Sequence, residues 1–93
     1  MDMFDSPFGP VELTDERWSH IVTFHPEVRL YHKYVNLTLS DPDFIRRSKL
    51  DPAVRICYRS IMRNKHLAVV LKTNQRNFVL TAYITSRIQV KPL

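Results

Sequence analysis

The apolar positions of residues 14–40 repeat with the spacing of α-helices. In the first run, Thr14 has the side chain of an N-cap, and acidic residues follow it in the first turn. The i, i+3, i+4, i+7 spacing that marks one helix face is met by Trp18, Ile21, Val22 and His25. Pro26 ends this helix and suits the first position of a second one. The second apolar stripe consists of Val28, Tyr31, Val35 and Leu39. The turn-forming residues at 40–43 predict its end.

The second half of the chain alternates between apolar and polar residues with a period of two, which is typical of β-strands. Strands are predicted at residues 44–48, 54–62, 65–72 and 77–85. Connections of two to five residues separate them, and connections this short favour an antiparallel meander.

Together these patterns predict a single α+β domain over residues 1–93. Residues 1–13 are predicted to be irregular because Pro7, Gly9 and Pro10 interrupt them. Residues 14–40 are helical, residues 44–85 form antiparallel strands, and residues 86–93 form a tail. The expected architecture is two N-terminal helices packed on one face of a four-stranded antiparallel sheet.

The alternation also predicts which side chains lie under the helices. The apolar set expected there consists of Val54, Ile56, Tyr58, Leu67, Val69, Leu71, Phe78, Leu80, Ala82 and Ile84. The opposite, uncovered face is then expected to be basic, hydroxyl-bearing and aromatic. Its members are Arg55, Arg59, His66, Lys72, Thr81, Tyr83 and Thr85.

Charge is divided unevenly along the chain. Residues 1–43 hold three basic residues and eight acidic ones, whereas residues 44–93 hold eleven basic residues and one acid, Asp51. A basic β-layer of this kind favours a polyanionic partner, of which nucleic acid is the commonest.

Composition argues against several other functions. One glycine provides no phosphate-binding loop, and one cysteine with four scattered histidines predicts no zinc site, so no cofactor or metal is expected. Cys57 cannot form an intramolecular disulfide, which fits a reducing cytoplasm. No run approaches the roughly 20 apolar residues of a membrane span, and no secretion signal is recognised.

Several stretches resemble the barnase, EndoU, colicin and RelE-like (BECR-fold) group of small nucleases, in particular its phage-associated and bacterial branch. The similar stretches are residues 18–27 (WSHIVTFHPE), 41–43 (DPD), 55–59 (RICYR), 65–72 (KHLAVVLK) and 78–85 (FVLTAYIT). This resemblance covers residues 14–88. It implies a helical part on a four-stranded antiparallel sheet, metal-independent RNA cleavage on the sheet face and, in many members, a toxin role with a neutralising partner.

The same resemblance suggests site residues. A helix-borne histidine corresponds to His25 or, as an alternative, His20, and a threonine of the last strand corresponds to Thr81 or Thr85. The basic strand residues correspond to Arg55, Arg59 and Lys72. Since the strands contain no acid that could act as a base, that role is left to His25 or Glu27.

These considerations predict a toxin-like endoribonuclease that uses 2′-hydroxyl attack. The expected catalytic residues are His25, Arg59, Lys72 and Thr81. The expected RNA-binding residues are Arg46, Arg47, Arg55, Tyr83 and Thr85. Two alternatives remain, namely a nucleic-acid-binding module without activity and a protein-interaction domain that docks on an acidic partner such as an antitoxin.

Overall fold

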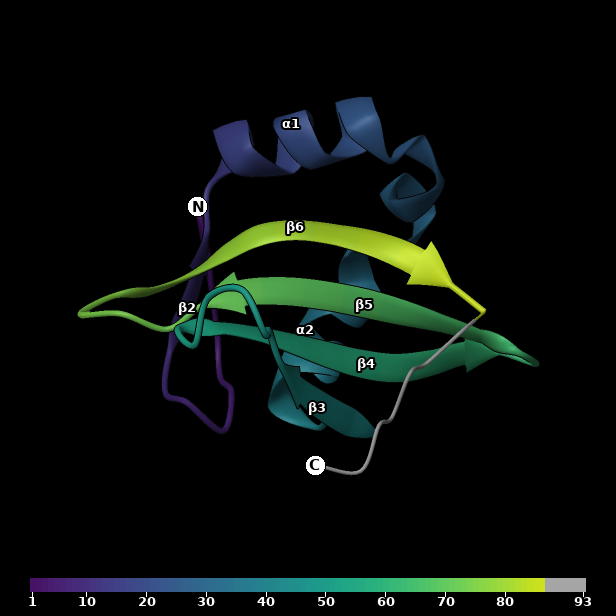
Figure 1. Cartoon of the computed structure of the whole chain (residues 1–93). Helices are drawn as coiled ribbons and strands as arrows, with labels where there is room; N and C mark the ends of the chain where they lie inside the picture. The colour runs from purple at the N-terminus through teal and green to yellow at the C-terminus, as the bar shows by residue number, and fades with distance from the viewer. Residues whose placement is uncertain (87–93) are drawn as a thin grey trace.

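The chain folds into helices packed against a six-stranded mixed β-sheet (Figure 1). The computed structural model describes residues 1–86. The strands are β1 (Asp2–Phe4), β2 (Val11–Leu13), β3 (Phe44–Arg47), β4 (Val54–Met62), β5 (Lys65–Lys72) and β6 (Asn77–Thr85). The helices are α1 (Asp15–Phe24), the 3₁₀ helix η1 (Pro26–Tyr31) and α2 (His32–Ser40). The spatial order of the strands is β1-β2-β6-β5-β4-β3.

The predicted four-stranded antiparallel sheet with two N-terminal helices is wrong, because two further strands precede the helices. Residues 1–13 form β1 and β2, which pair with each other antiparallel, and β2 pairs with β6 in parallel. Val11 and Leu13 are buried while Glu12 between them is half-buried, so this segment also alternates with a period of two. Gly9, at φ +98°, closes the turn between β1 and β2 by donating its N–H to the Ser6 carbonyl at 3.0 Å.

The helical region follows its predicted start and stop signals. The Arg17 N–H donates to Thr14 Oγ1 at 3.0 Å, which confirms Thr14 as the N-cap of α1. His25 ends α1, and Pro26 begins the next element, as predicted. That element is not one helix, however. It opens as a 3₁₀ helix and becomes α-helical only at His32.

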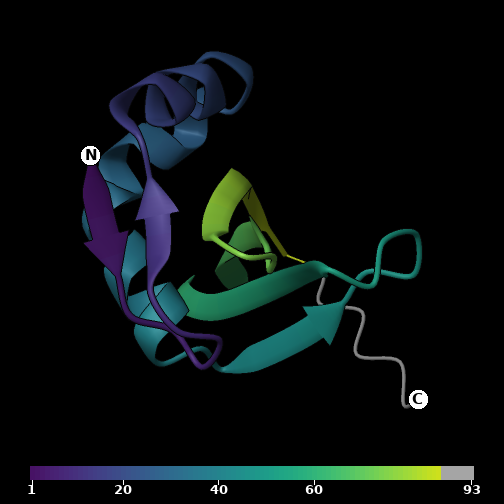
Figure 2. The same ribbon diagram turned by 90° about the vertical axis from the view of Figure 1, so that its left-hand side faces the viewer.

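The helices share one core with the sheet. The helix α1 and η1 lie on β6, and α2 lies on β4 and β5. Figure 2, in which the ribbon is turned by 90°, shows the helices along one side of the curved sheet. The buried side chains of this core are Val11, Leu13, Ile21, Val28, Val35, Leu39, Cys57, Leu67, Val69, Leu71, Val79 and Ala82.

The strand registers correct the predicted faces of β4. Cys57 lies opposite Val69, and Arg59 lies opposite Leu67. Residues opposite each other in antiparallel strands point to the same side, so Arg55, Cys57 and Arg59 face the helices. The expectation that both arginines share a face with Lys72, Thr81 and Tyr83 is therefore wrong. Val54, Ile56 and Tyr58 occupy the other side.

A bulge in β6 corrects one more assignment. Val70 pairs with Thr81 and Leu71 pairs with Val79, so Leu80 is an extra residue in β6. The extra residue reverses the alternation, which places Val79 rather than Phe78 in the core. Beyond the bulge, Ala82 and Ile84 face the core as predicted. The predicted tail at residues 86–93 falls outside the described residues from position 87 onward.

Candidate functional site on the outer sheet face

The side of β3–β6 that is turned away from the helices is called the outer face here. The registers place on it Phe44, Arg46, Val54, Ile56, Tyr58, Ser60, His66, Ala68, Val70, Lys72, Phe78, Thr81, Tyr83 and Thr85. Of the predicted site residues, this face brings together Arg46, Lys72, Thr81, Tyr83 and Thr85. Arg46, Ile56, Val70 and Thr81 form one row across four strands. The face therefore combines hydroxyl groups, aromatic rings and positive charge.

Two tyrosines meet on this face over an alanine. Tyr58 of β4 and Tyr83 of β6 both lie opposite Ala68 of β5, whose side chain is fully buried. Strands two apart are separated by roughly 10 Å, which two tyrosine side chains bridge when the residue between them is as small as alanine. Tyr58 is 3% exposed and Tyr83 is half-buried, so the pair is held in place by packing.

The environment of Tyr83 keeps its hydroxyl protonated. Burial, followed by the electrostatic influence of Tyr58 and a hydrogen bond with its hydroxyl, raises the pKa of Tyr83 to about 12, and the positive charge of Arg46 partly opposes this rise. At neutral pH Tyr83 is thus uncharged, and its hydroxyl lies within the electrostatic influence of the Arg46 guanidinium. That combination suits a phosphate oxygen.

His25 reaches the same region from the helical layer. It lies at the junction of α1 and η1, and its ring centroid is 6.1 Å from that of Tyr83. His25 Nδ1 lies 3.7 Å from Glu27 Oε2, and both side chains are partly exposed to solvent, at 37% and 46%. A partly exposed histidine with a carboxylate 3.7 Å from one ring nitrogen has the chemistry of a proton-transfer group.

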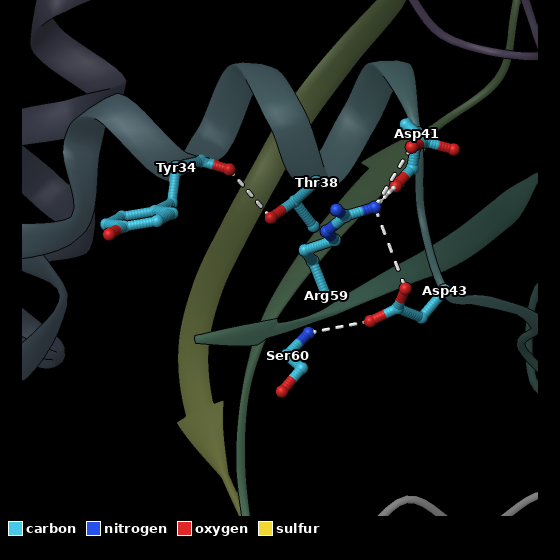
Figure 3. Close-up of polar contacts among 6 residues, drawn as sticks. All are labelled: Tyr34, Thr38, Asp41, Asp43, Arg59 and Ser60. Atoms are coloured by element: carbon cyan, nitrogen blue, oxygen red, sulfur yellow. Dashed lines mark hydrogen bonds and ion pairs between the residues drawn. The ribbon is translucent and has the colours of Figure 1, made fainter. Parts of the chain in front are cut away.

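The arginine that the sequence predicts to be catalytic, Arg59, is held by partners within the fold. Its Nη1 donates to the Asp41 carbonyl at 2.6 Å and to Asp41 Oδ2 at 3.1 Å, and it lies 3.6 Å from Asp43 Oδ1 (Figure 3). Asp43 also accepts the Ser60 N–H at 2.8 Å. These contacts join β4 to the loop that follows α2, on the helix side of the sheet.

Arg55 and Lys72 also have partners within the fold. Arg55 Nη1 donates to the Pro52 carbonyl, and its guanidinium lies 5.6 Å from the centre of the Phe8 ring. Lys72 Nζ lies 3.4 Å from Asp51 Oδ2 on the outer face. The pKa of Asp51 is lowered, chiefly by the Ala53 N–H and to a lesser degree by Lys72. Arg47 lies opposite Arg55 and is exposed at the β3 edge, so it belongs to the helix side.

Sequence reasoning placed Tyr58 on the wrong face, whereas it expected His66 on the uncovered face but gave it no role at the site. Tyr58 was assigned to the core because it lies on the same face of the strand as the apolar residues Val54 and Ile56. Nothing in the sequence indicates that Arg46 lies close to Tyr58. His66 lies opposite Thr85, and its buried Nδ1 has no hydrogen-bond partner among residues 1–86. The other predicted histidine alternative, His20, is exposed on α1 and contacts Phe24, 4.8 Å between ring centres.

Neither metal ligands nor a membrane span is found within residues 1–86. No three histidine, cysteine or acidic side chains of this region are grouped to hold a metal ion. No helix in the same region is long and apolar enough to cross a membrane. A comparison of the chain with protein-family models, with curated proteins and with solved structures finds no match, so its function is inferred from its own residues.

Proposed function

We propose that this protein is a metal-independent endoribonuclease whose site lies between the α1–η1 junction and the outer face. The observation that supports this proposal is the approach of His25 to Tyr83, which are 58 residues apart in the chain and 6.1 Å apart between ring centres. Glu27 adds a carboxylate 3.7 Å from the histidine, and Arg46, whose charge influences Tyr83, adds a cation for the phosphate on the same face.

In the proposed reaction His25 removes the proton of a ribose 2′-hydroxyl. The 2′-oxygen attacks the adjacent phosphorus, the bond from phosphorus to the 5′-oxygen breaks, and that oxygen takes a proton from water. The products are a 2′,3′-cyclic phosphate and a free 5′-hydroxyl. Glu27 orients His25 and stabilises its protonated ring. Tyr83 and Arg46 stabilise the negative charge that gathers on the phosphate oxygens.

The roles expected from the sequence are revised accordingly. Arg46 replaces Arg55 and Arg59 as the phosphate-binding arginine, because those two lie on the helix side. Thr81, which the sequence predicts to be catalytic, is assigned the role of positioning the nucleotide, since it lies in the same row as Arg46. Lys72 and Thr85 lie further along the outer face and would contact neighbouring parts of the RNA.

A second candidate function is RNA binding without cleavage. It is favoured by the aromatic rings of the outer face, where Phe44 is 45% exposed and lies in the row of Tyr58 and Tyr83. Aromatic side chains on a sheet bind single-stranded RNA by stacking on its bases. In this case the RNA affinity would depend on Phe44 and Tyr83, whereas His25 would be dispensable.

The two functions are separated by an RNA cleavage assay in the presence of a chelator. The wild-type protein is expected to release fragments that end in 2′,3′-cyclic phosphate, and His25→Asn should lower the rate at least about 100-fold, as for loss of a general base. His20→Asn is the matched control, because His20 is an exposed histidine of the same helix, and it should leave the rate unchanged. Binding of RNA without fragments from the wild-type protein would refute cleavage.

A toxin role and a cytoplasmic location belong to the same proposal. An acidic inhibitor protein that covers the outer face would block access to both Arg46 and Tyr83. Co-purification of such an inhibitor should then be lost on Arg46→Glu, which reverses the charge that the inhibitor would contact.

A further inference from the structure

A pocket lies at the other end of β6 from the His25–Tyr83 pair. It is enclosed by the end of β2, the start of α1 and the start of β6, and its volume is about 310 Å³. The lining residues are Glu12, Thr14, Arg17, Arg76, Phe78 and Val79. This volume is at the lower end of the roughly 300–1,000 Å³ of ligand pockets, which is room for one small molecule or one nucleotide unit.

The charges of this pocket are not balanced by the fold. Arg17 is half-buried and Arg76 is exposed, and neither has an acidic group within ion-pair distance among residues 1–86. Glu12 also lacks such a pair in this part of the chain. Two arginines and one glutamate leave the lining with a net charge of +1. Two guanidinium groups that line the same pocket form an energetically favourable arrangement when an anion is bound between them.

The remaining lining suits a nucleobase. Phe78 is half-buried and lies opposite Glu12 in the β2–β6 pairing, so an aromatic ring and a carboxylate stand on the same side. A base can stack on the ring while its N–H groups donate to the carboxylate. The Thr14 hydroxyl oxygen accepts a hydrogen bond from the backbone N–H of Arg17, and this bond fixes the position of Thr14 in the pocket wall.

We infer that this pocket binds one nucleotide of a single-stranded RNA, with its phosphate between Arg17 and Arg76 and its base on Phe78. The inference rests on the proposed function, because it makes the pocket a subsite for the RNA that is cut at His25. The helix α1 and the strand β6 lie side by side and run in the same direction (Figure 1). Arg17 precedes His25 by eight helical residues, or about 12 Å. Phe78 precedes Tyr83 by five strand residues, or about 16 Å. A short single strand spans such a distance.

The first test uses backbone amide shifts of the isotope-labelled His25→Asn protein, which should not cut RNA. Uridine 5′-monophosphate is expected to shift the amides of residues 12–17 and 76–79, and inorganic phosphate should need a higher concentration to do so. Equal shifts with phosphate would identify a simple anion site and overturn the inference. Absence of shifts at these residues, or shifts spread evenly over the chain, would also overturn it.

The second test measures the affinity for a labelled polyuridine strand. The double variant Arg17→Gln/Arg76→Gln should weaken binding at least about fivefold. It should also reduce the slope of log affinity against log salt concentration by about 0.7, because the pocket contacts one phosphate and each phosphate contact to a single strand contributes about 0.7 to that slope. Arg47→Gln/Lys49→Gln is the charge-matched control. It removes one cation at the end of β3 and one shortly after it, at the opposite edge of the sheet, and should change the affinity less than twofold. Equal weakening by both double variants would refute the subsite.

These outcomes are separable from those of the proposed function. Nucleotide binding in the pocket without any RNA cleavage by the wild-type protein would leave the pocket in place and refute the nuclease. Cleavage that depends on His25, with no nucleotide-induced shifts at the pocket, would refute the pocket alone.

Discussion

The substitution Arg59→Ala tests whether Arg59 stabilises the fold or binds the phosphate of the RNA. The arginine is 26% exposed and donates to the carbonyl and the carboxylate of Asp41, while Asp43 lies 3.6 Å away. These contacts fasten β4 to the end of the helical region. We therefore expect Arg59→Ala to destabilise the protein and to leave RNA binding and cleavage intact.

The size of this loss follows from the exposure of the partners. A hydrogen bond to a charged group is worth about 1.5–3 kcal/mol, whereas exposed ion pairs contribute about 0–1 kcal/mol. The Asp41 carboxylate is 76% exposed, so the bond to the Asp41 carbonyl supplies most of the energy, with a smaller part from Asp43, which is 37% exposed. The expected loss is about 2 kcal/mol. For a domain of this size it corresponds to a fall in Tm of about 8–16 °C.

The assay is urea and thermal unfolding followed by circular dichroism, with RNA affinity measured at a temperature where the variant is folded. Arg47→Ala is the control, since Arg47 is also a strand arginine of the helix side but is exposed and has no ion pair within residues 1–86. A stability equal to that of the wild-type protein, together with a loss of RNA binding, would refute the structural role. It would restore the phosphate-binding role that the sequence predicts.

Two further predictions concern the tyrosine pair. Ala68→Leu should force Tyr58 and Tyr83 apart and, by overpacking, cost about 1–3 kcal/mol of unfolding free energy. It should also lower the pKa of Tyr83 towards its ordinary value of 10. An unchanged Tyr83 pKa in a spectrophotometric tyrosine titration would contradict the geometry. The wild-type protein should lose stability as the pH rises from about 10 to about 12, because the unfolded chain releases the Tyr83 proton at a lower pH than the folded one. Urea unfolding across that range should show a weaker pH dependence for Tyr83→Phe, and an equal dependence in both proteins would argue against a raised pKa.

The limits of the strands β4, β5 and β6 could be predicted from the sequence because their alternation and their turns are local signals. The faces of β4 could not, since each side of this strand mixes polar and apolar residues. The guanidinium group of Arg59 binds the Asp41 carbonyl and lies close to the Asp43 carboxylate. Because of these partners the arginine can lie on the helix side, although the alternation of the sequence predicts it on the solvent-exposed face. The bulge at Leu80 likewise has no local signal and depends on how β6 pairs with β5.

The site was accessible to sequence reasoning only in part. His25, Thr81 and Tyr83 were selected from the resemblance and the charge pattern, and the structure brings His25 close to Tyr83. The proximity of Tyr58 and Arg46 to Tyr83 arises from cross-strand registers, which are tertiary. The strands β1 and β2 were missed for the same reason. Each is three residues long, and β2 joins the main sheet only through β6, which follows it by more than 60 residues.

The parallel pairing of β2 with β6 has a consequence for synthesis on the ribosome. The strand β2 has no place in the main sheet until β6 has left the exit tunnel, so the domain completes its fold only after β6 has emerged. Tyr83 belongs to that last strand. If the proposed nuclease function holds, a nascent chain that has not yet released β6 is inert towards RNA, including the message from which it is being made.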